Sequence, residues 1–215
     1  MLHSTTHKIL LALIALGLTF VVSSCDNSTG VEDPELDVQK AKDVPANADA
    51  GRGAPPDFTF YSLSEGEIVA DEDSASTNWD LGFSSTTVLT NSGSSGPGQG
   101  GAVILDIPFE EVDMAPSEGY NVDSDSQLAI PTGSGNGWYK YTGDNEPKRA
   151  ILPLPEKTIV VRTANGNYAK VEILSYYEGN PDTSTDEFAN TETRPDGRYY
   201  TFRYVIQSDG SRDLE

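Results

Sequence analysis

The sequence has very few of the side chains that act as nucleophiles or ligate soft metals. Its single cysteine, Cys25, and its two histidines, His3 and His7, all lie in the first 25 of 215 residues. The remainder has neither imidazole nor thiol, which excludes a Ser-His-Asp or Cys-His nucleophile system, a Cys/His zinc site and a disulfide framework. A hydrolase built from this chain would depend on carboxylates, and a metal site would depend on oxygen ligands.

The chain also has no apolar run long enough for a comfortable membrane span. A polar head at 1–8 precedes an uninterrupted apolar stretch at 9–22, and Val22-Ser-Ser-Cys25 ends it with small residues. This layout predicts a secretory signal peptide at 1–24. Because Cys25 follows at lipobox spacing, the segment resembles a bacterial lipoprotein signal, cleaved before a cysteine that then carries acyl chains such as palmitate. The alternative is an ordinary signal peptide with an incidental cysteine.

Basic residues are scarce. The chain has 14 Lys and Arg against 34 Asp and Glu, a net charge of -20 at pH 7. Proteins bind nucleic acid largely by placing Lys and Arg on its phosphates, which releases counterions. A chain with so few basic residues is not expected to have a nucleic-acid partner. Solubility and self-repulsion at a wet surface account for the excess acid.

Apolar patterning divides the mature chain in two. Residues 25–56 contain few β-branched and no aromatic residues, and predict a disordered acidic tether behind the lipidated Cys25. Residues 57–215 fit one domain in size and read as strands. Asn165-Gly166 separates two strand-like runs, 157–163 and 168–177, as the turn of a hairpin. Helix is expected only in short pieces, such as 109–112. The predicted fold class is all-β, a single antiparallel domain.

A glycine-rich loop contains Gly96-x-Gly98-x-x-Gly101, the spelling of a dinucleotide-binding fingerprint. That fingerprint requires a helix after the last glycine, but the following residues, 102–109, are β-branched and apolar and include Pro108. Residues 79–90 before it also read as strand. The loop therefore joins strands, and its glycines need a structural explanation.

Six ordered stretches together resemble the HmuY family. They are NWDLGF at 78–83, TNSG at 90–93, GQGGA at 98–102, PSEGYNVD at 116–123, GW at 137–138 and IVVRTANGNYAKV at 159–171. The resemblance implies an outer-membrane, surface-exposed lipoprotein of Bacteroidetes-type bacteria with an all-β, grip-shaped domain. It also implies that the protein is not an enzyme and that it captures haem or another porphyrin for iron acquisition, alongside an outer-membrane receptor. In the family the glycine-rich stretch links two strands, which makes residues 93–101 structural.

The chain departs from the family where haem iron would be bound. Haem-binding members carry two axial histidines or methionines on two loops, which here are 124–136 and the residues near Thr142 and Gly143. Neither loop holds such a residue. The mature chain's one methionine, Met114, lies upstream of both and fits a gap-filling apolar role.

Tyrosinate is a further haem ligand, which makes Tyr120, Tyr139 and Tyr141 the remaining candidates. Tyr139 and Tyr141 are predicted to share one strand face, opposite Trp138 and Lys140. Activation of a phenol would fall to Arg149 or Arg162.

Lys140, Lys148 and Arg149 cluster near the second loop. They would pair with porphyrin propionates or remain solvated surface charges.

Three other functions stay open at this stage. The first is an interaction or structural lipoprotein that keeps the fold without haem, which the missing axial pair supports. The second is a carboxylate enzyme such as a glycosidase, with Asp80 as the candidate acid, although carboxylate pairs have no spacing signature. The third is calcium binding by the acidic loop at 182–187, where EF-hand spacing is missing.

Overall fold

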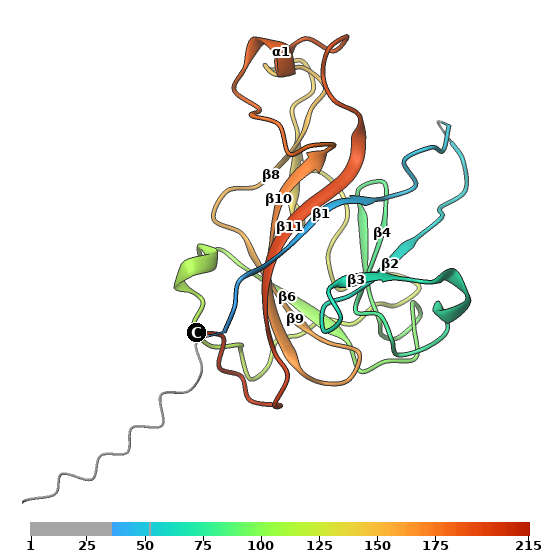
Figure 1. Cartoon of the computed structure of the whole chain (residues 1–215), viewed down its shortest axis with the longest axis vertical. Helices are drawn as coiled ribbons and strands as arrows, with labels where there is room; N and C mark the ends of the chain where they lie inside the picture. Colours follow the sequence, from blue (N-terminus) through green and yellow to red (C-terminus); the bar gives the residue numbers. More distant parts are fainter. Residues whose placement is uncertain (1–35, 52) are drawn as a thin grey trace, which may run out of the picture. The chain divides into compact units, whose positions relative to one another are not determined.

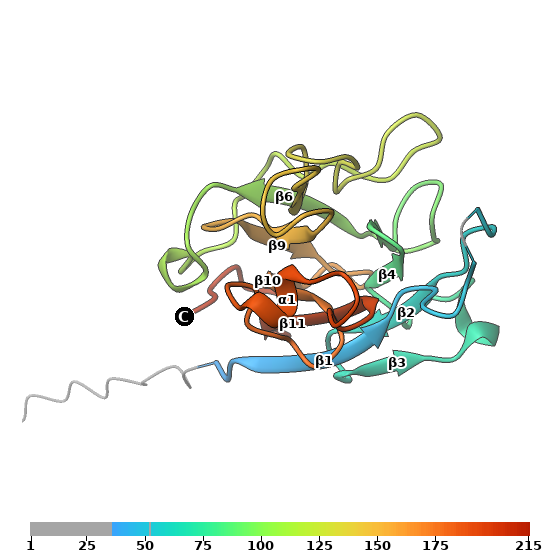
Figure 2. The same cartoon turned by 90° about the horizontal axis from the view of Figure 1, so that it is seen from above.

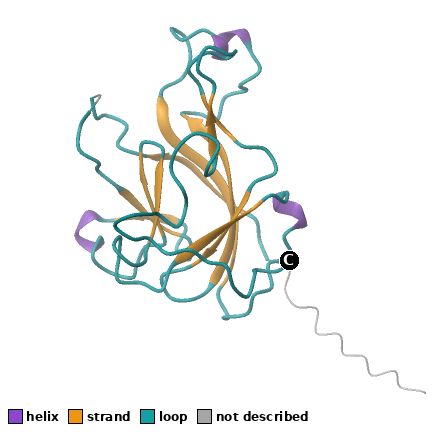
Figure 3. Cartoon of the chain, turned by 180° about the vertical axis from the view of Figure 1, so that it is seen from behind, coloured by secondary structure: helices purple, strands orange, loops and turns teal. Residues whose placement is uncertain are grey.

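A computed structural model describes residues 36–51 and 53–215, which consist mostly of antiparallel strands with three very short helices (Figures 1 and 3). The predicted all-β class is confirmed. The predicted signal peptide at 1–24 and the lipidation site Cys25 lie outside the described residues.

The larger sheet has five strands, and each neighbouring pair is antiparallel. Figure 2 shows them following one another across the sheet. In spatial order they are β1 (Gln39–Pro45), β11 (Gly197–Gln207), β10 (Tyr168–Tyr177), β9 (Thr158–Arg162) and β6 (Gly101–Leu105). The hairpin predicted at Asn165-Gly166 joins β9 to β10, and Gly166 has the positive φ that such a turn requires.

Two smaller sheets and the short helices complete the domain. The four-stranded sheet has the order β3 (Glu67–Val69), β2 (Thr59–Ser62), β4 (Leu81–Ser84), β5 (Thr87–Thr90), and the two-stranded sheet pairs β7 (Tyr139–Tyr141) with β8 (Ile151–Pro153). The helices are η1 (Asp71–Asp73), η2 (Phe109–Glu111) and α1 (Asp186–Ala189). Helix α1 lies in the connection between β10 and β11, at the end of the larger sheet farthest from the C-terminus (Figure 1).

Aromatic side chains of β11 form the centre of the core. Alternate residues Tyr200, Phe202 and Tyr204 are at most 1% exposed, as the strand alternation predicts. Phe202 packs on Tyr61 of β2 with ring centroids 5.2 Å apart, and Tyr200 packs on Phe83 of β4 at 4.7 Å. These contacts hold the four-stranded sheet against the larger one, and burial of such rings is the main source of stability in a domain of this kind.

The predicted tether is too long, because β1 lies within residues 25–56. Ala41, Val44 and Ala46 are buried, and β1 pairs with β11 along one edge of the larger sheet. Small side chains are enough for an edge strand that covers a core already filled by aromatic residues, so low apolar content did not reveal it. The single strand expected at 79–90 is also two strands, β4 and β5, which turn at Ser85 in the left-handed region.

The glycine-rich loop joins β5 to β6, and no helix follows it. A Cβ at Gly98 would lie 2.7 Å from the carbonyl oxygen of Asn91, and one at Gly93 would clash with the carbonyl oxygen of Asp123. The loop is packed too closely against its neighbours to accept side chains at these positions. This confirms the structural interpretation of the loop.

Candidate functional site

The most recognisable motif residues are buried groups that hold the loops together. Asp80 accepts hydrogen bonds from the backbone N–H of Leu63 (2.8 Å) and of Ala164 (2.9 Å), one on each carboxylate oxygen. Burial raises the pKa of Asp80, and these two hydrogen bonds oppose the rise. Because both oxygens bind the backbone of distant segments, the carboxylate is occupied by a structural task and the geometry gives the glycosidase hypothesis no support.

Asn91 and Asp123 continue this network. The Asn91 amide donates to the carbonyl oxygen of Trp79 and accepts from the N–H of Gly98, both at 2.9 Å. The two Asp123 oxygens accept from the N–H groups of Thr90 (3.0 Å) and Ala129 (2.7 Å). We call Asp80, Asn91 and Asp123 the loop-fixing network. All three side chains are at most 5% exposed and are bonded to the backbone, so they serve the scaffold and do not face a ligand.

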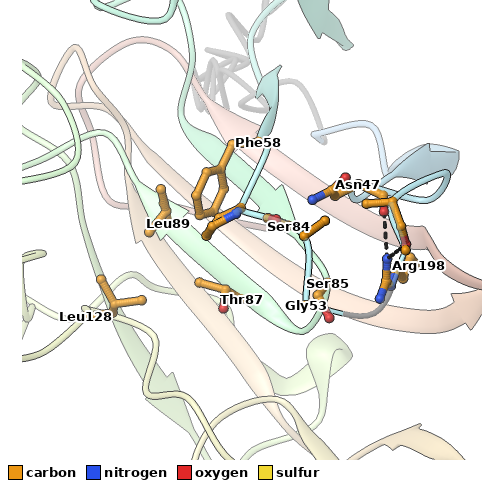
Figure 4. A pocket seen from close by; sticks show the side chains of 13 residues that line it. Asn47, Gly53, Phe58, Ser84, Ser85, Thr87, Leu89, Leu128 and Arg198 are labelled. Carbon is orange, nitrogen blue, oxygen red and sulfur yellow. Dashed lines mark hydrogen bonds between the residues drawn. The ribbon is translucent and has the colours of Figure 1, made fainter.

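A first hollow lies between the 47–58 segment and the β4–β5 hairpin (Figure 4). Its volume is about 380 Å³, and its walls combine apolar side chains with hydroxyl groups. Phe58, Leu89 and Leu128 supply the apolar part, and Ser84 and Thr87 supply hydroxyls. Hollows of this size accommodate small ligands.

A second hollow, of about 480 Å³, shares Ala50 and Arg198 with the first. It is lined by the end of β10, the start of β11 and the loop before β8. Three arginines line it, Arg149, Arg194 and Arg198, and we call it the arginine hollow. The sequence did not mark Arg194 or Arg198 as ligand-binding residues, because Arg194 lies in no motif and Arg198 stands only at the start of a strand-like run.

The first of the two loops at which the family resemblance places axial ligands contributes Leu128 to the first hollow. Neither Thr142 nor Gly143 of the second position lines either hollow, but Arg149, six residues beyond Gly143, lines the arginine hollow. Thr142 itself is occupied within its loop, where its hydroxyl donates to the carbonyl oxygen of Pro147 (2.6 Å) and accepts from the N–H of Ala150 (2.8 Å). The loops therefore approach the hollows without presenting an iron ligand.

The tyrosines proposed as substitutes lie in different environments. Tyr139 is 8% exposed and packs on Trp138 with ring centroids 4.8 Å apart, whereas Tyr141 is 49% exposed. Trp138 precedes β7 and shares the core with Tyr139, so the predicted opposition of these two rings is wrong. Neither tyrosine lines either of the two hollows.

Tyr120 and Met114 lie elsewhere in the domain. Arg162 lies over the Tyr120 ring, 5.5 Å from its centroid. It is one of the two arginines predicted to activate a phenol. Burial nevertheless raises the pKa of Tyr120 to about 12, against the opposing charge of Arg162, so its phenol stays protonated at neutral pH. Met114 is 55% exposed and bridges to Asp213 near the C-terminus, so its predicted gap-filling role is wrong.

The expected basic cluster is only partly assembled. Lys148 pairs with Glu146 at 3.6 Å on the surface, and Lys140 is exposed on β7. Arg149 alone of the three predicted cations lines one of the two hollows.

These residues do not fit axial coordination of haem iron. Within 36–51 and 53–215 there is no histidine or cysteine, and neither Met114 nor the candidate tyrosines, Tyr120, Tyr139 and Tyr141, line either of the two hollows. No cluster of acidic side chains in the described residues is arranged to hold a metal ion. In the loop proposed for calcium, Asp182 instead accepts from the N–H and hydroxyl of Ser184 (2.9 and 2.7 Å).

Across the same described residues, no helix is long and apolar enough to cross a membrane. The family model described as "HmuY protein" matches residues 54–188. Comparison with curated proteins finds no match.

Two solved structures are among those to which the chain is similar. The apo HmuY analog of Tannerella forsythia is 14% identical, with 82% of this chain and 100% of that chain covered and a TM-score of 0.49. Apo PinO from Porphyromonas gingivitis is also 14% identical, with 80% and 98% covered and a TM-score of 0.49.

Proposed function

We start from the premise that the chain belongs to the HmuY family, and we propose that it is a non-enzymatic, ligand-binding lipoprotein of the outer membrane. Cys25 carries the acyl chains, and the domain captures its ligand outside the membrane without axial coordination of haem iron. The observation that supports this ligand mode is the lining of the two hollows, which includes Leu128 and Arg149 but no histidine or methionine.

The anchor would hold the domain close to the membrane. Strand β1 begins at Gln39, so only residues 26–38 separate it from Cys25. Thirteen fully extended residues span at most about 45 Å. The corrected tether is thus much shorter than the one predicted from composition.

Lipidation is tested by labelling cells with a palmitate analogue and comparing the natural chain with Cys25→Ser. We expect label on the natural chain in the outer-membrane fraction and none on the variant. An unlabelled, released natural chain would contradict the anchor.

The ligand mode is tested by titrating haemin into the mature chain from Asp26 onward and following the Soret band. We expect no saturable shift beyond that of an unrelated acidic protein. Tyr139→Phe and Tyr141→Phe are matched controls, one buried and one exposed. A saturable one-to-one shift would overturn the proposal and restore haem capture as the function, and its loss in Tyr141→Phe would identify tyrosinate as the iron ligand.

A further inference from the structure

The arginine hollow concentrates positive charge in a strongly acidic protein. Three of the 14 basic residues line it, two from loops and Arg198 from the start of β11. Asp49 and Asp196 also line it, yet no carboxylate of residues 36–51 or 53–215 lies within 4 Å of these guanidinium groups. By contrast, Lys157 and Arg203 are each paired with acidic side chains. The guanidinium charges of Arg149 and Arg198 are therefore not paired with a carboxylate of these residues.

Backbone carbonyls hold two of the arginines in place. Arg194 donates through Nε to the carbonyl oxygen of Phe188 (2.8 Å), through Nη1 to that of Arg149 (3.2 Å) and through Nη2 to that of Lys148 (2.8 Å). All three nitrogens of this guanidinium are thus used by the backbone. Arg198 donates through Nη1 to the carbonyl oxygens of Asn47 (2.9 Å) and Ala50 (2.7 Å), which leaves its Nε and Nη2 groups outside these bonds (Figure 4). Carbonyls orient a guanidinium without neutralising it, so binding an anion here costs little side-chain entropy.

Arg149 occupies a strained position next to them. Its φ of 55° lies in the left-handed region, where glycine is the relaxed residue, and its N–H donates to the carbonyl oxygen of Gly143 at 2.8 Å. Arg198 has a φ of 70°, so two of the three arginines of the hollow lie in the left-handed region.

The other walls indicate what kind of anion fits. Tyr199 is half-buried and lines the hollow with aromatic surface, beside Tyr176 and Tyr177, which are only 7% and 5% exposed. Asp49 and Asp196 offer carboxylate acceptors. Guanidinium groups bind a carboxylate in a bidentate manner, carboxylates accept hydrogen bonds from hydroxyls, and aromatic rings cover the apolar face of a sugar. A neutral sugar has no carboxylate for the arginines. A simple anion has no ring face for the aromatic wall and no hydroxyl groups for the carboxylates.

We propose that the arginine hollow binds an acidic sugar, a hexuronate residue, with its carboxylate on Arg149 and Arg198 and its hydroxyls toward Asp49 and Asp196. This inference rests on the proposed function, that the domain is a binding protein, and names its ligand class. A volume of about 480 Å³ accommodates a ring of this size.

The test is calorimetric titration of the mature chain with glucuronate, and with glucose, acetate and phosphate as separate probes. We expect saturable one-to-one binding of glucuronate alone. Arg149→Gln should weaken it about tenfold or more, which corresponds to about 1.4 kcal/mol. Lys148→Gln is the matched control. It removes one positive charge at the neighbouring residue, but Lys148 is paired with Glu146, so the affinity should not change.

Absence of glucuronate binding, or equal affinity for Arg149→Gln and the natural chain, would overturn the site. Equal binding of acetate or phosphate would overturn the sugar and leave a simple anion site. Failure of the proposed function gives a different result from failure of this site: a saturable Soret shift when haemin is titrated into the same protein.

Discussion

The loop-fixing network and the arginine hollow are both built from charged and polar side chains, yet they use them in opposite ways. In the network, both carboxylate oxygens of Asp80 and of Asp123 are bound to backbone N–H groups of distant segments. In the hollow, charges of both signs face a cavity without pairing. The residues that mark the family thus specify the scaffold, while the residues that border the hollows differ from the family's iron ligands. Family membership therefore predicts the fold better than it predicts the ligand.

The strongest test of this contrast removes an acceptor from the network. Asp123→Ala leaves the N–H groups of Thr90 and Ala129 buried without a partner. Each orphaned donor costs about 1–3 kcal/mol, so we expect the free energy of unfolding to fall by about 2–6 kcal/mol in urea denaturation. Asp182→Ala, an exposed carboxylate that bonds only to Ser184 within its own loop, should change it by less than about 0.5 kcal/mol. Equal effects of the two substitutions would remove the distinction between scaffold and surface.

The glycine-rich loop offers the next test of the scaffold. A Cβ at Gly98 meets the Asn91 carbonyl oxygen at 2.7 Å and the Ala164 Cβ at 2.8 Å, whereas one at Gly51 meets nothing within 4 Å. We expect Gly98→Ala to lower the free energy of unfolding by about 1–3 kcal/mol through overpacking. Gly51→Ala should leave it unchanged or slightly raised, because alanine restricts the unfolded chain. An unchanged free energy of unfolding in Gly98→Ala would mean that the loop can shift to accept a side chain, and that close packing does not require glycine there.

Local patterns predicted the scaffold because its determinants are local. The Asn165-Gly166 turn and the alternation of Tyr200, Phe202 and Tyr204 fix a hairpin and a core face within ten residues of sequence. Strand β1 escaped prediction because an edge strand needs few large side chains. The arginine hollow could not be predicted, since Arg149 and Arg198 become neighbours only when β8 and β11 are placed by the sheets.

Tyr120 differs from the residues of the loop-fixing network, because its hydroxyl is buried without a hydrogen-bond partner in the described residues. Burial raises its pKa from 10.0 to about 12. The folded state keeps the proton more tightly, so this contribution to stability is present below pH 10 and is lost as the pH rises toward 12. Tyr120→Phe should remove that pH dependence and raise the free energy of unfolding at pH 7 by about 1 kcal/mol. A loss of stability at pH 7 would show that the hydroxyl is satisfied, for example by a buried water.

The smallest expected effect has the opposite sign from those of the network substitutions. Arg149→Gly relaxes a residue with a φ of 55° and should raise the free energy of unfolding by about 0.5–1 kcal/mol, while glucuronate binding is lost. Glu156, exposed in a turn with a φ of 56°, is the matched control: Glu156→Gly should give a similar gain without changing the affinity. A stability gain at both positions with a binding loss only at Arg149 would mean that strain at Arg149 is retained for the ligand. If Arg149→Gly instead destabilised the domain, Arg149 would belong to the scaffold, and the contrast between the two regions would no longer hold at this residue.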